Sequence, residues 1–262
     1  MIIERVLEEA TPYLEGINIK DAVIGISLIG MELSNNHVGV SYVLRENLKS
    51  GCSIFPYAQD ILGKDSLEIA EWALTGQDDL QRSIGVAVLT AASRSLPLAD
   101  ADTSIHPFSI EITPEDNVCL IGYIPQVANM FNGMVKNVFI FDRGVSQKGG
   151  IFGKVLPEEE QKDILPKCEI VFLSGTTVIN HSIEELLSLC KNAREIVLIG
   201  ASTPMFPNAF VGTGVSILAG SWWDEGKKDK IFRNISLAGG ISHISKFAIK
   251  KKCKGIKKLV RK

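Results

Sequence analysis

The spacing of apolar and polar positions divides the chain into two halves with different patterns. Residues 2–14 carry apolar side chains at helical spacing among glutamates, which predicts an amphipathic helix. Residues 21–33 and 37–46 are rich in β-branched and other apolar residues, and the Ser-Asn-Asn sequence between them favours a hairpin turn, so we expect two antiparallel strands. Two helical segments follow, and Asp78 is suited to cap the second. A hairpin followed by helices predicts a small α+β domain.

The second half, from Asn117 onward, alternates short, continuously apolar segments with amphipathic helical ones. This alternation predicts a mostly parallel sheet covered by helices on both faces, the doubly wound arrangement of Rossmann-like domains. The intervening stretch is rich in Pro, Asp and Thr and has no periodicity, so it is expected to join the halves. We therefore expect an α/β protein with an α+β domain over residues 1–105, a Rossmann-like domain over 106–245 and a basic tail over 246–262.

Charge and composition narrow the classes of function. The formal net charge of −2 argues against nucleic-acid binding by the protein as a whole. The basic tail is the exception, with nine Lys and Arg residues and no acidic one; we interpret it as a solvated, partly frayed terminus, with an amphipathic helix for an acidic partner as the alternative. The chain has neither a signal sequence nor an apolar run long enough to span a membrane, which predicts a cytoplasmic protein. Five isolated cysteines without a CxxC pair indicate reduced thiols.

Small and polar residues follow the predicted strands of the second half. Ligands bind outside the carboxyl ends of the strands in an open parallel sheet, so these positions are candidates for a binding site, although each is also explained by turn or helix-cap chemistry. The segment 174–182, SGTTVINHS, favours a polar or anionic ligand because hydroxyls and backbone amides precede a helix there. The candidate ligand-binding residues are Gly122, Tyr123, Asp142, Ser174, Thr176, Thr177, Asn180, Ser202, Thr203 and Pro204.

Complete catalytic motifs are absent from the sequence. The turn IGYIPQVAN at 121–129 keeps only Gly122 of a dinucleotide-binding fingerprint, so we do not expect ordinary NAD binding, although Asp142 stands 20 residues later, where a ribose-binding acid would fall. No Walker A loop, nucleophile elbow or HExxH helix occurs. No histidine has a partner at metal-ligand spacing, and taken singly each is explained as a surface or structural residue. His37 and His181 remain candidate metal ligands or general bases because they come from different halves.

Several segments together resemble a family of prokaryotic proteins known as putative heavy-metal chelation domains. The resemblance implies an enolase N-terminal-like domain, a Rossmann-like second domain and a site where the two meet. Carried over by motif, it points to 176–180 and 202–204 as site-forming positions, whereas Thr90 stands where relatives carry an Asn. The segments, which span nearly the whole chain, are IGISLIG, HVGVSYVL, SIGVAVLTAAS, SGTTVINHSIEELL and LIGASTPMFPNAFVGTGVSILAG.

These patterns favour a protein that binds a small polar or anionic ligand in the cleft between its domains. A heavy metal or a metal chelate is the specific candidate for that ligand or cofactor. The alternative is an enzyme with a nucleotide-like cofactor on the Rossmann-like half and His37 or His181 as general base. A third hypothesis makes the chain an assembly subunit whose basic tail docks an acidic partner. The sequence leaves catalysis and homo-oligomer formation open.

Overall fold

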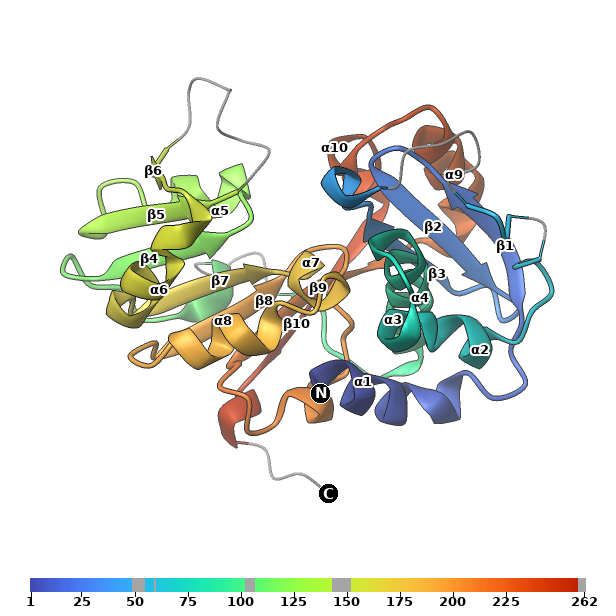
Figure 1. Ribbon diagram of the computed structural model, residues 1–262, viewed down its shortest axis with the longest axis horizontal. Helices are drawn as coiled ribbons and strands as arrows, with labels where there is room; N and C mark the ends of the chain where they lie inside the picture. Colours follow the sequence, from blue (N-terminus) through green and yellow to red (C-terminus); the bar gives the residue numbers. More distant parts are fainter. Residues whose placement is uncertain (49–54, 59, 102–106, 143–151, 259–262) are drawn as a thin grey trace.

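The computed structural model describes residues 1–48, 55–58, 60–101, 107–142 and 152–258. They form two lobes, one built on a three-stranded sheet and the other on a seven-stranded sheet (Figure 1). No helix in these ranges is both long and apolar enough to cross a membrane.

The smaller lobe contains three antiparallel strands in the order β1-β2-β3. They are β1 (Ile19–Ile24), β2 (Leu28–Leu33) and β3 (Val38–Tyr42). The expectation of two strands is therefore wrong, because the segment 21–33 holds an additional turn. Gly25 makes that turn: its N–H donates to the Leu28 carbonyl at 2.9 Å, and a Cβ at this position would lie 2.5 Å from the Ile235 carbonyl oxygen. Only glycine fits so close to a neighbouring backbone.

Helices from the first half cover one face of this small sheet. The longest, α4, begins after Asp78, whose carboxylate accepts a hydrogen bond from the Gln81 N–H at 2.9 Å, which confirms the expected cap. Close packing of α4 on β3 depends on Gly39, because a Cβ there would lie 1.9 Å from the Ala87 carbonyl oxygen. Thr90 is buried in this contact and donates its hydroxyl to the same carbonyl at 2.8 Å. The four helices are α1 (Ile2–Ala10), α2 (Ser66–Ala70), α3 (Trp72–Thr75) and α4 (Asp79–Ala92).

The opposite face of the small sheet is covered by a helix from the far end of the chain, α9 (Lys228–Ser236). Figure 1 shows this helix beside β1 and β2, although the sequence pattern assigned its residues to the Rossmann-like range. Its Phe232 and Ile235 share a buried cluster with Leu28 of β2. The Lys228 ammonium lies 2.7 Å from an Asp21 carboxylate oxygen. A segment from the C-terminal part of the chain therefore completes the smaller lobe.

The larger lobe has the strand order β10-β9-β8-β7-β4-β5-β6, and only the β9–β10 pair is antiparallel. The order reverses between β4 and β7, as in doubly wound sheets, and helices pack on both faces. The expected α/β fold, a small α+β domain followed by a Rossmann-like one, is therefore confirmed. Its elements are β4 (Asn117–Ile121), α5 (Pro125–Met130), β5 (Asn137–Phe141), β6 (Lys154–Val155), α6 (Gln161–Ile164), β7 (Ile170–Ser174), α7 (Thr176–Ile179), α8 (Ile183–Leu189), β8 (Glu195–Ile199), β9 (Ile217–Trp223) and β10 (Ala248–Lys254). The short helix α10 (Ile241–Ile244) instead contacts α9, and its Ile244 joins the buried cluster on the small sheet.

Strand β10 corrects the interpretation of the basic tail as a frayed end or an amphipathic helix. It pairs antiparallel with β9 along its whole length. Lys251 is buried, with its ammonium 3.9 Å from the centre of the Trp222 ring and 2.6 Å from an Asp100 carboxylate oxygen. The lysine stem covers apolar surface while its charge is compensated, so a lysine-rich segment can form a sheet strand. Residues 259–262 lie outside the described part of the chain.

Candidate functional site

The reversal of strand order places the carboxyl ends of β4 and β7 side by side, where the connecting segments diverge. Gly122 follows β4 with φ of +90°, and its N–H donates to the Phe141 carbonyl at 2.8 Å. A Cβ on Gly122 would lie 2.8 Å from the Cβ of Ser174, the last residue of β7. The structure thus brings these two expected site residues into contact at the topological switch point, the usual place for a ligand in such sheets.

Ser174 is the centre of a small hydroxyl network at the start of α7. Its Oγ accepts hydrogen bonds from the Thr176 hydroxyl at 2.9 Å and from the Thr176 N–H at 3.3 Å. The Thr177 hydroxyl, which is buried, donates to the Ser174 carbonyl at 2.8 Å. Because Ser174 accepts both Thr176 bonds, its own proton is left to donate, and a ligand oxygen is a suitable acceptor.

The loop after β8 lies directly against the start of α7. A Cβ on Gly175 would be 2.6 Å from the Thr203 backbone nitrogen, so glycine is needed for this approach. Ser202, Thr203 and Pro204 are all buried. The Thr203 hydroxyl oxygen has no hydrogen-bond partner among the described residues, and such burial is unfavourable unless a further group satisfies it.

Tyr42, at the end of β3, connects the smaller lobe to this loop and was missed by the sequence reasoning. Its N–H donates to the Ser202 hydroxyl oxygen at 2.9 Å. Its half-buried ring packs against the cluster that contains Ala201 and Ile244. Burial raises the pKa of the Tyr42 phenol to about 12, so the group stays protonated and can donate a hydrogen bond. The only signal in the sequence was its position at the end of a strand.

Asp142 and Tyr123 are joined at the edge of the same region. The Tyr123 N–H donates to a carboxylate oxygen of Asp142 at 2.7 Å. This bond supports the turn after β4, as the turn interpretation of Asp142 expects. One Asp142 oxygen is therefore engaged by the protein backbone, at the position where a ribose-binding acid was considered. Arg143 and Gly144, which follow Asp142 in the chain, lie outside the described residues.

Asn180 and His181 are used at the other end of α7. The exposed Asn180 accepts hydrogen bonds from the Ser182 hydroxyl at 2.8 Å and from the Ser182 N–H at 3.2 Å, just before α8 begins. His181 has φ of +58°, and its Nε2 donates to the Ala73 carbonyl of the smaller lobe at 2.8 Å. Both residues therefore make local or interlobe contacts and none to Ser174 or Ser202 that the structure records.

His37 has a different set of neighbours from His181. Its Nδ1 lies 3.4 Å from the Asn35 side-chain nitrogen, and its Nε2 lies 3.9 Å from a Glu225 carboxylate oxygen. Burial lowers the pKa of His37, and the nearby Glu225 carboxylate partly offsets this effect. Among the residues that the structure describes, no three His, Cys, Asp or Glu side chains are placed to hold a metal ion. The hydroxyl and amide groups found near Ser174 fit an oxygen-rich molecule better than a bare heavy-metal ion.

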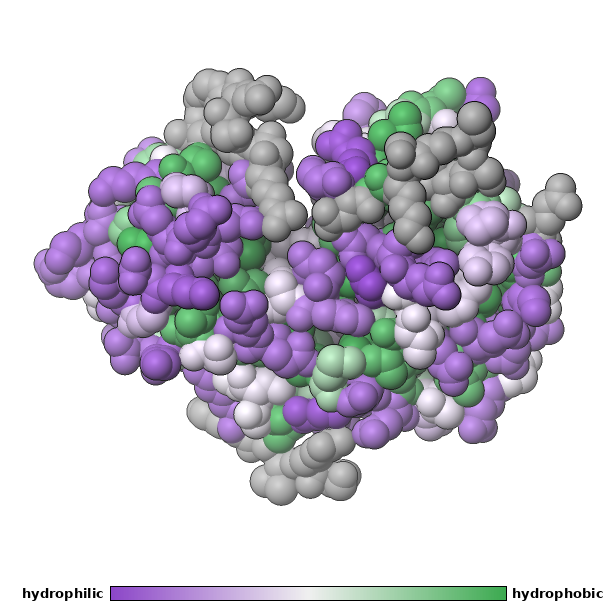
Figure 2. Space-filling view, viewed as in Figure 1, coloured by the Kyte–Doolittle hydropathy of each residue, from purple (hydrophilic) through white to green (hydrophobic). Residues whose placement is uncertain are grey.

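The described cysteines are free thiols, and three of them are buried in the larger lobe. Burial raises the pKa of Cys190 to about 12 and also raises that of Cys119, so neither is poised as a thiolate ligand. Cys52 and His106 lie outside the described part of the chain. Between the two lobes the molecular surface is hollowed, on the side where α10 lies (Figure 2).

Comparison with known proteins gives the chain a family. A family model described as "Putative heavy-metal chelation" (DUF364) matches residues 106–254, and a second with the same description (DUF4213) matches residues 7–93. A curated, uncharacterised protein of Methanocaldococcus jannaschii is 27% identical over 145 residues, which are 54% of either chain. The present chain thus spans about half the length of that relative.

Two solved structures share the whole fold. A DUF364 protein of unknown function from Pyrococcus horikoshii has a TM-score of 0.76 and 20% identity, with 97% of this chain and 100% of that chain covered. One from Desulfitobacterium hafniense has a TM-score of 0.74 and 21% identity, with 96% and 98% covered. At these identities the likeness shows the fold, whereas the family models match directly at the level of sequence. The chain belongs to the DUF364 family, whose description is putative heavy-metal chelation.

Proposed function

We propose that this protein binds a small polar or anionic molecule in the crevice between its lobes, outside the carboxyl ends of β4, β7 and β8. The observation that carries the proposal is the contact of Gly122 with Ser174 at the point where the strand order reverses. Loops of different strands diverge at such a point and leave room for a ligand. Tyr42 of the smaller lobe is joined to the loop after β8 by the bond from its backbone N–H to Ser202.

The groups around the crevice define the chemistry of the ligand. Ser174 has a hydroxyl proton left to donate, and Thr203 has a buried hydroxyl oxygen without a partner among the described residues. We assign the protonated Tyr42 phenol as a second donor to the ligand. Hydroxyl donors recognise carboxylate, phosphate or polyol oxygens. We therefore expect a ligand that presents several oxygen atoms.

The family description adds a heavy metal to this proposal. The hydroxyl groups are poor ligands for soft metal ions, so the protein would take the metal as a complex whose other ligands are already in place. The protein residues then recognise the oxygen atoms of the chelator. The proposed site residues His37 and His181 have no role in this scheme beyond the contacts already described.

The test is isothermal titration calorimetry with citrate and with nickel(II) citrate, each added to the purified protein. Tyr42→Phe and Ser174→Ala each remove one hydroxyl, and we expect either change to weaken binding about tenfold, as the loss of a buried hydrogen bond implies. Tyr13→Phe is the matched control, because Tyr13, whose ring centroid lies 6.3 Å from that of Phe206, has no recorded hydrogen bond to Ser174, Ser202 or Thr203. Absence of saturable binding to both probes, or equal affinity in all variants, would overturn the proposal.

A further inference from the structure

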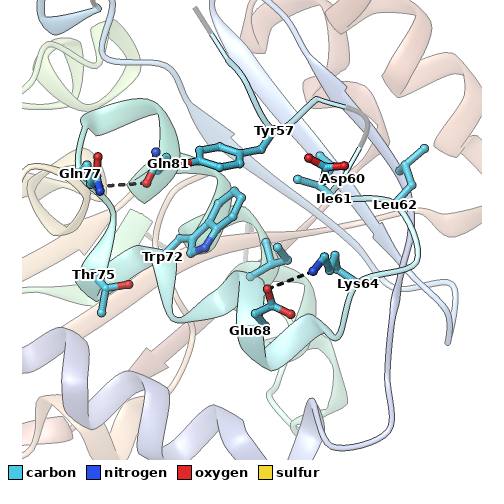
Figure 3. Close-up of a pocket in the computed structure, with 11 residues that line it drawn as sticks. Tyr57, Asp60, Ile61, Leu62, Lys64, Glu68, Trp72, Thr75, Gln77 and Gln81 are labelled. Atoms are coloured by element: carbon cyan, nitrogen blue, oxygen red, sulfur yellow. Dashed lines mark hydrogen bonds and ion pairs between the residues drawn. The ribbon is translucent and has the colours of Figure 1, made fainter.

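A second groove lies on the smaller lobe, away from the crevice between the lobes. It has a volume of about 730 Å³, within the range of small-molecule sites. Figure 3 shows two aromatic rings in its middle, with charged side chains at one side and glutamines at the other. Its lining residues are Tyr57, Asp60, Ile61, Leu62, Lys64, Glu68, Ile69, Trp72, Thr75, Gln77 and Gln81.

Tyr57 and Trp72 form an aromatic surface in this groove. Their ring centroids are 5.6 Å apart at an angle of 52°, and Phe55 contacts both rings, at 5.9 Å and 6.2 Å. The Tyr57 residue is 38% exposed. A separation of 5.6 Å is too small for another group to enter between the rings. A ligand must therefore lie against their outer faces, which carry the negative part of the aromatic quadrupole.

The charges beside the rings are unequal. Lys64 is already paired with Glu68 at 3.4 Å. The Asp60 carboxylate is exposed and has no hydrogen-bond or ion-pair partner within the described ranges. The described lining residues therefore include two carboxylates and one ammonium, and the charge left unpaired among them is negative. A cation would be attracted both by the ring faces and by Asp60.

We infer that this groove binds a small organic cation, an amine or a quaternary ammonium group. The cation lies over the Tyr57 and Trp72 faces and beside Asp60. The Gln81 side-chain oxygen accepts a hydrogen bond from the Gln77 N–H at 3.1 Å, so the NH₂ group of Gln81 is left for a polar substituent of the ligand. A free anion is disfavoured because Lys64, the one ammonium among the described lining residues, is already paired with Glu68. The inference is independent of the crevice proposed above.

The experiment compares choline with its uncharged carbon isostere, 3,3-dimethylbutan-1-ol, by NMR titration of the tryptophan indole N–H signals. Trp222 and Trp223 are buried, at 7% and 0% exposure, so Trp72 is the indole that a ligand in the groove reaches. We expect the Trp72 signal to shift with choline and affinity for the isostere to be about fivefold lower, as an exposed cation–π contact implies. Equal affinity for the two probes, or no shift of the Trp72 signal, would overturn the inference.

Variants separate the charge from the shape of the groove. Asp60→Asn keeps the volume and removes the unpaired charge, and we expect it to weaken choline binding about threefold without affecting the isostere. Tyr57→Leu removes one ring face and should weaken choline binding by a similar factor. Asp163→Asn is the matched control, because it removes an exposed carboxylate from α6 of the larger lobe. N-acetyl-lysine amide is a second cationic probe, with a primary ammonium in place of the quaternary one, and we expect it to shift the Trp72 signal as well. Unchanged choline affinity in both groove variants would refute the inference.

Discussion

At the residue scale, the hydroxyls near the crevice differ in whether the protein already satisfies them. Thr177 donates to the Ser174 carbonyl at 2.8 Å, whereas the Thr203 hydroxyl oxygen has no partner in the described part of the chain. Both residues are buried, with exposed fractions of 3% for Thr177 and 1% for Thr203. The two positions therefore offer a matched pair, equal in burial and residue type and different in hydrogen bonding.

Replacement of Thr203 by Val should raise the free energy of unfolding by about 1 kcal/mol, because it removes a buried polar group that gains nothing from burial. Thr177→Val should lower it by about 1 kcal/mol, because a satisfied hydrogen bond is lost. Urea unfolding of the ligand-free proteins measures both changes. Loss of stability in Thr203→Val equal to that in Thr177→Val would mean that the Thr203 hydroxyl has a partner in solution.

A buried carboxylate at the start of the larger sheet predicts a dependence on pH. Asp116 accepts hydrogen bonds from Arg194 at 2.7 Å and 2.5 Å and from the Thr113 N–H at 2.7 Å. The bonds from Arg194 lower the pKa of Asp116 below its ordinary value, against the opposing effect of burial. A lowered pKa in the folded state means that the ionised carboxylate stabilises the fold above the unfolded-state pKa. This stabilisation is lost as the pH falls through the folded-state pKa.

Asp116→Asn should therefore lower the free energy of unfolding by about 1 kcal/mol at neutral pH, a small value because Arg194 is partly exposed. In acid the variant and the unmodified protein should be equally stable. Thermal unfolding between neutral pH and the acid limit measures it. Glu115→Gln, at an exposed neighbouring position, serves as control. A difference that stays constant over this range would show that ionisation of Asp116 does not contribute.

At the scale of elements, backbone contact between β3 and α4 is the tightest requirement of the smaller lobe. A Cβ on Gly39 would lie 1.9 Å from the Ala87 carbonyl oxygen and 2.6 Å from the Ala91 nitrogen, both of which are backbone atoms. Gly39→Ala should therefore lower the free energy of unfolding by about 3 kcal/mol or more, because α4 and β3 must move apart to make room for the added methyl group. Gly240→Ala is the control, since nothing lies within 4 Å of a Cβ there and its φ is −91°. Urea unfolding compares the two, and similar stabilities would contradict the close approach.

Elements with a local signal could be predicted from the sequence. The cap of α4 at Asp78 and the alternation of strands and helices after Asn117 depend on neighbouring residues, and the structure contains both. The turn at Gly25 and strand β10 could not be predicted in the same way. The first is set by the approach of Ile235, and the second by the contact of Lys251 with Trp222, and both are long-range contacts.

The candidate site shows the same division. The residues after the strands, such as Gly122 and Ser174, could be selected because parallel strands end at a common edge. Tyr42 could not be selected in this way, because its contact with Ser202 joins two lobes and leaves no local pattern in the sequence. Asn180 and His181 belong to the same motif as Thr176, but the chain turns away at His181, where φ is +58°.

At the scale of the whole molecule, the exchange of α9 makes the two lobes physically dependent. The Lys228 ammonium lies 2.7 Å from Asp21 and 3.3 Å from Glu32, and Glu32 is 5% exposed. The charge of Glu32 is therefore compensated in part by a residue almost 200 positions later in the chain. The family models end their first match at residue 93, yet the sheet in that range is completed by residues 228–236.

This exchange leads to a prediction about the isolated first half. In a fragment of residues 1–101, the sheet face formed by Leu28, Val38 and Val40 would lose the cover of Phe232 and Ile235 and be exposed to water. We expect this fragment to lack a cooperative unfolding transition, because the apolar area buried on that face is a large share of what stabilises so small a sheet. Circular dichroism during urea titration measures the transition.

The matched control is the same fragment joined through a flexible linker to residues 224–247, which restores α9 and should restore the transition. A further version with Phe232→Ala in the added segment should lose stability again by about 3 kcal/mol, as expected for a buried aromatic side chain. Cooperative unfolding of 1–101 alone, at the same urea concentration as the joined fragment, would contradict the dependence. In that case α9 would only rest on a sheet that is stable without it, and the smaller lobe would be an independent folding unit.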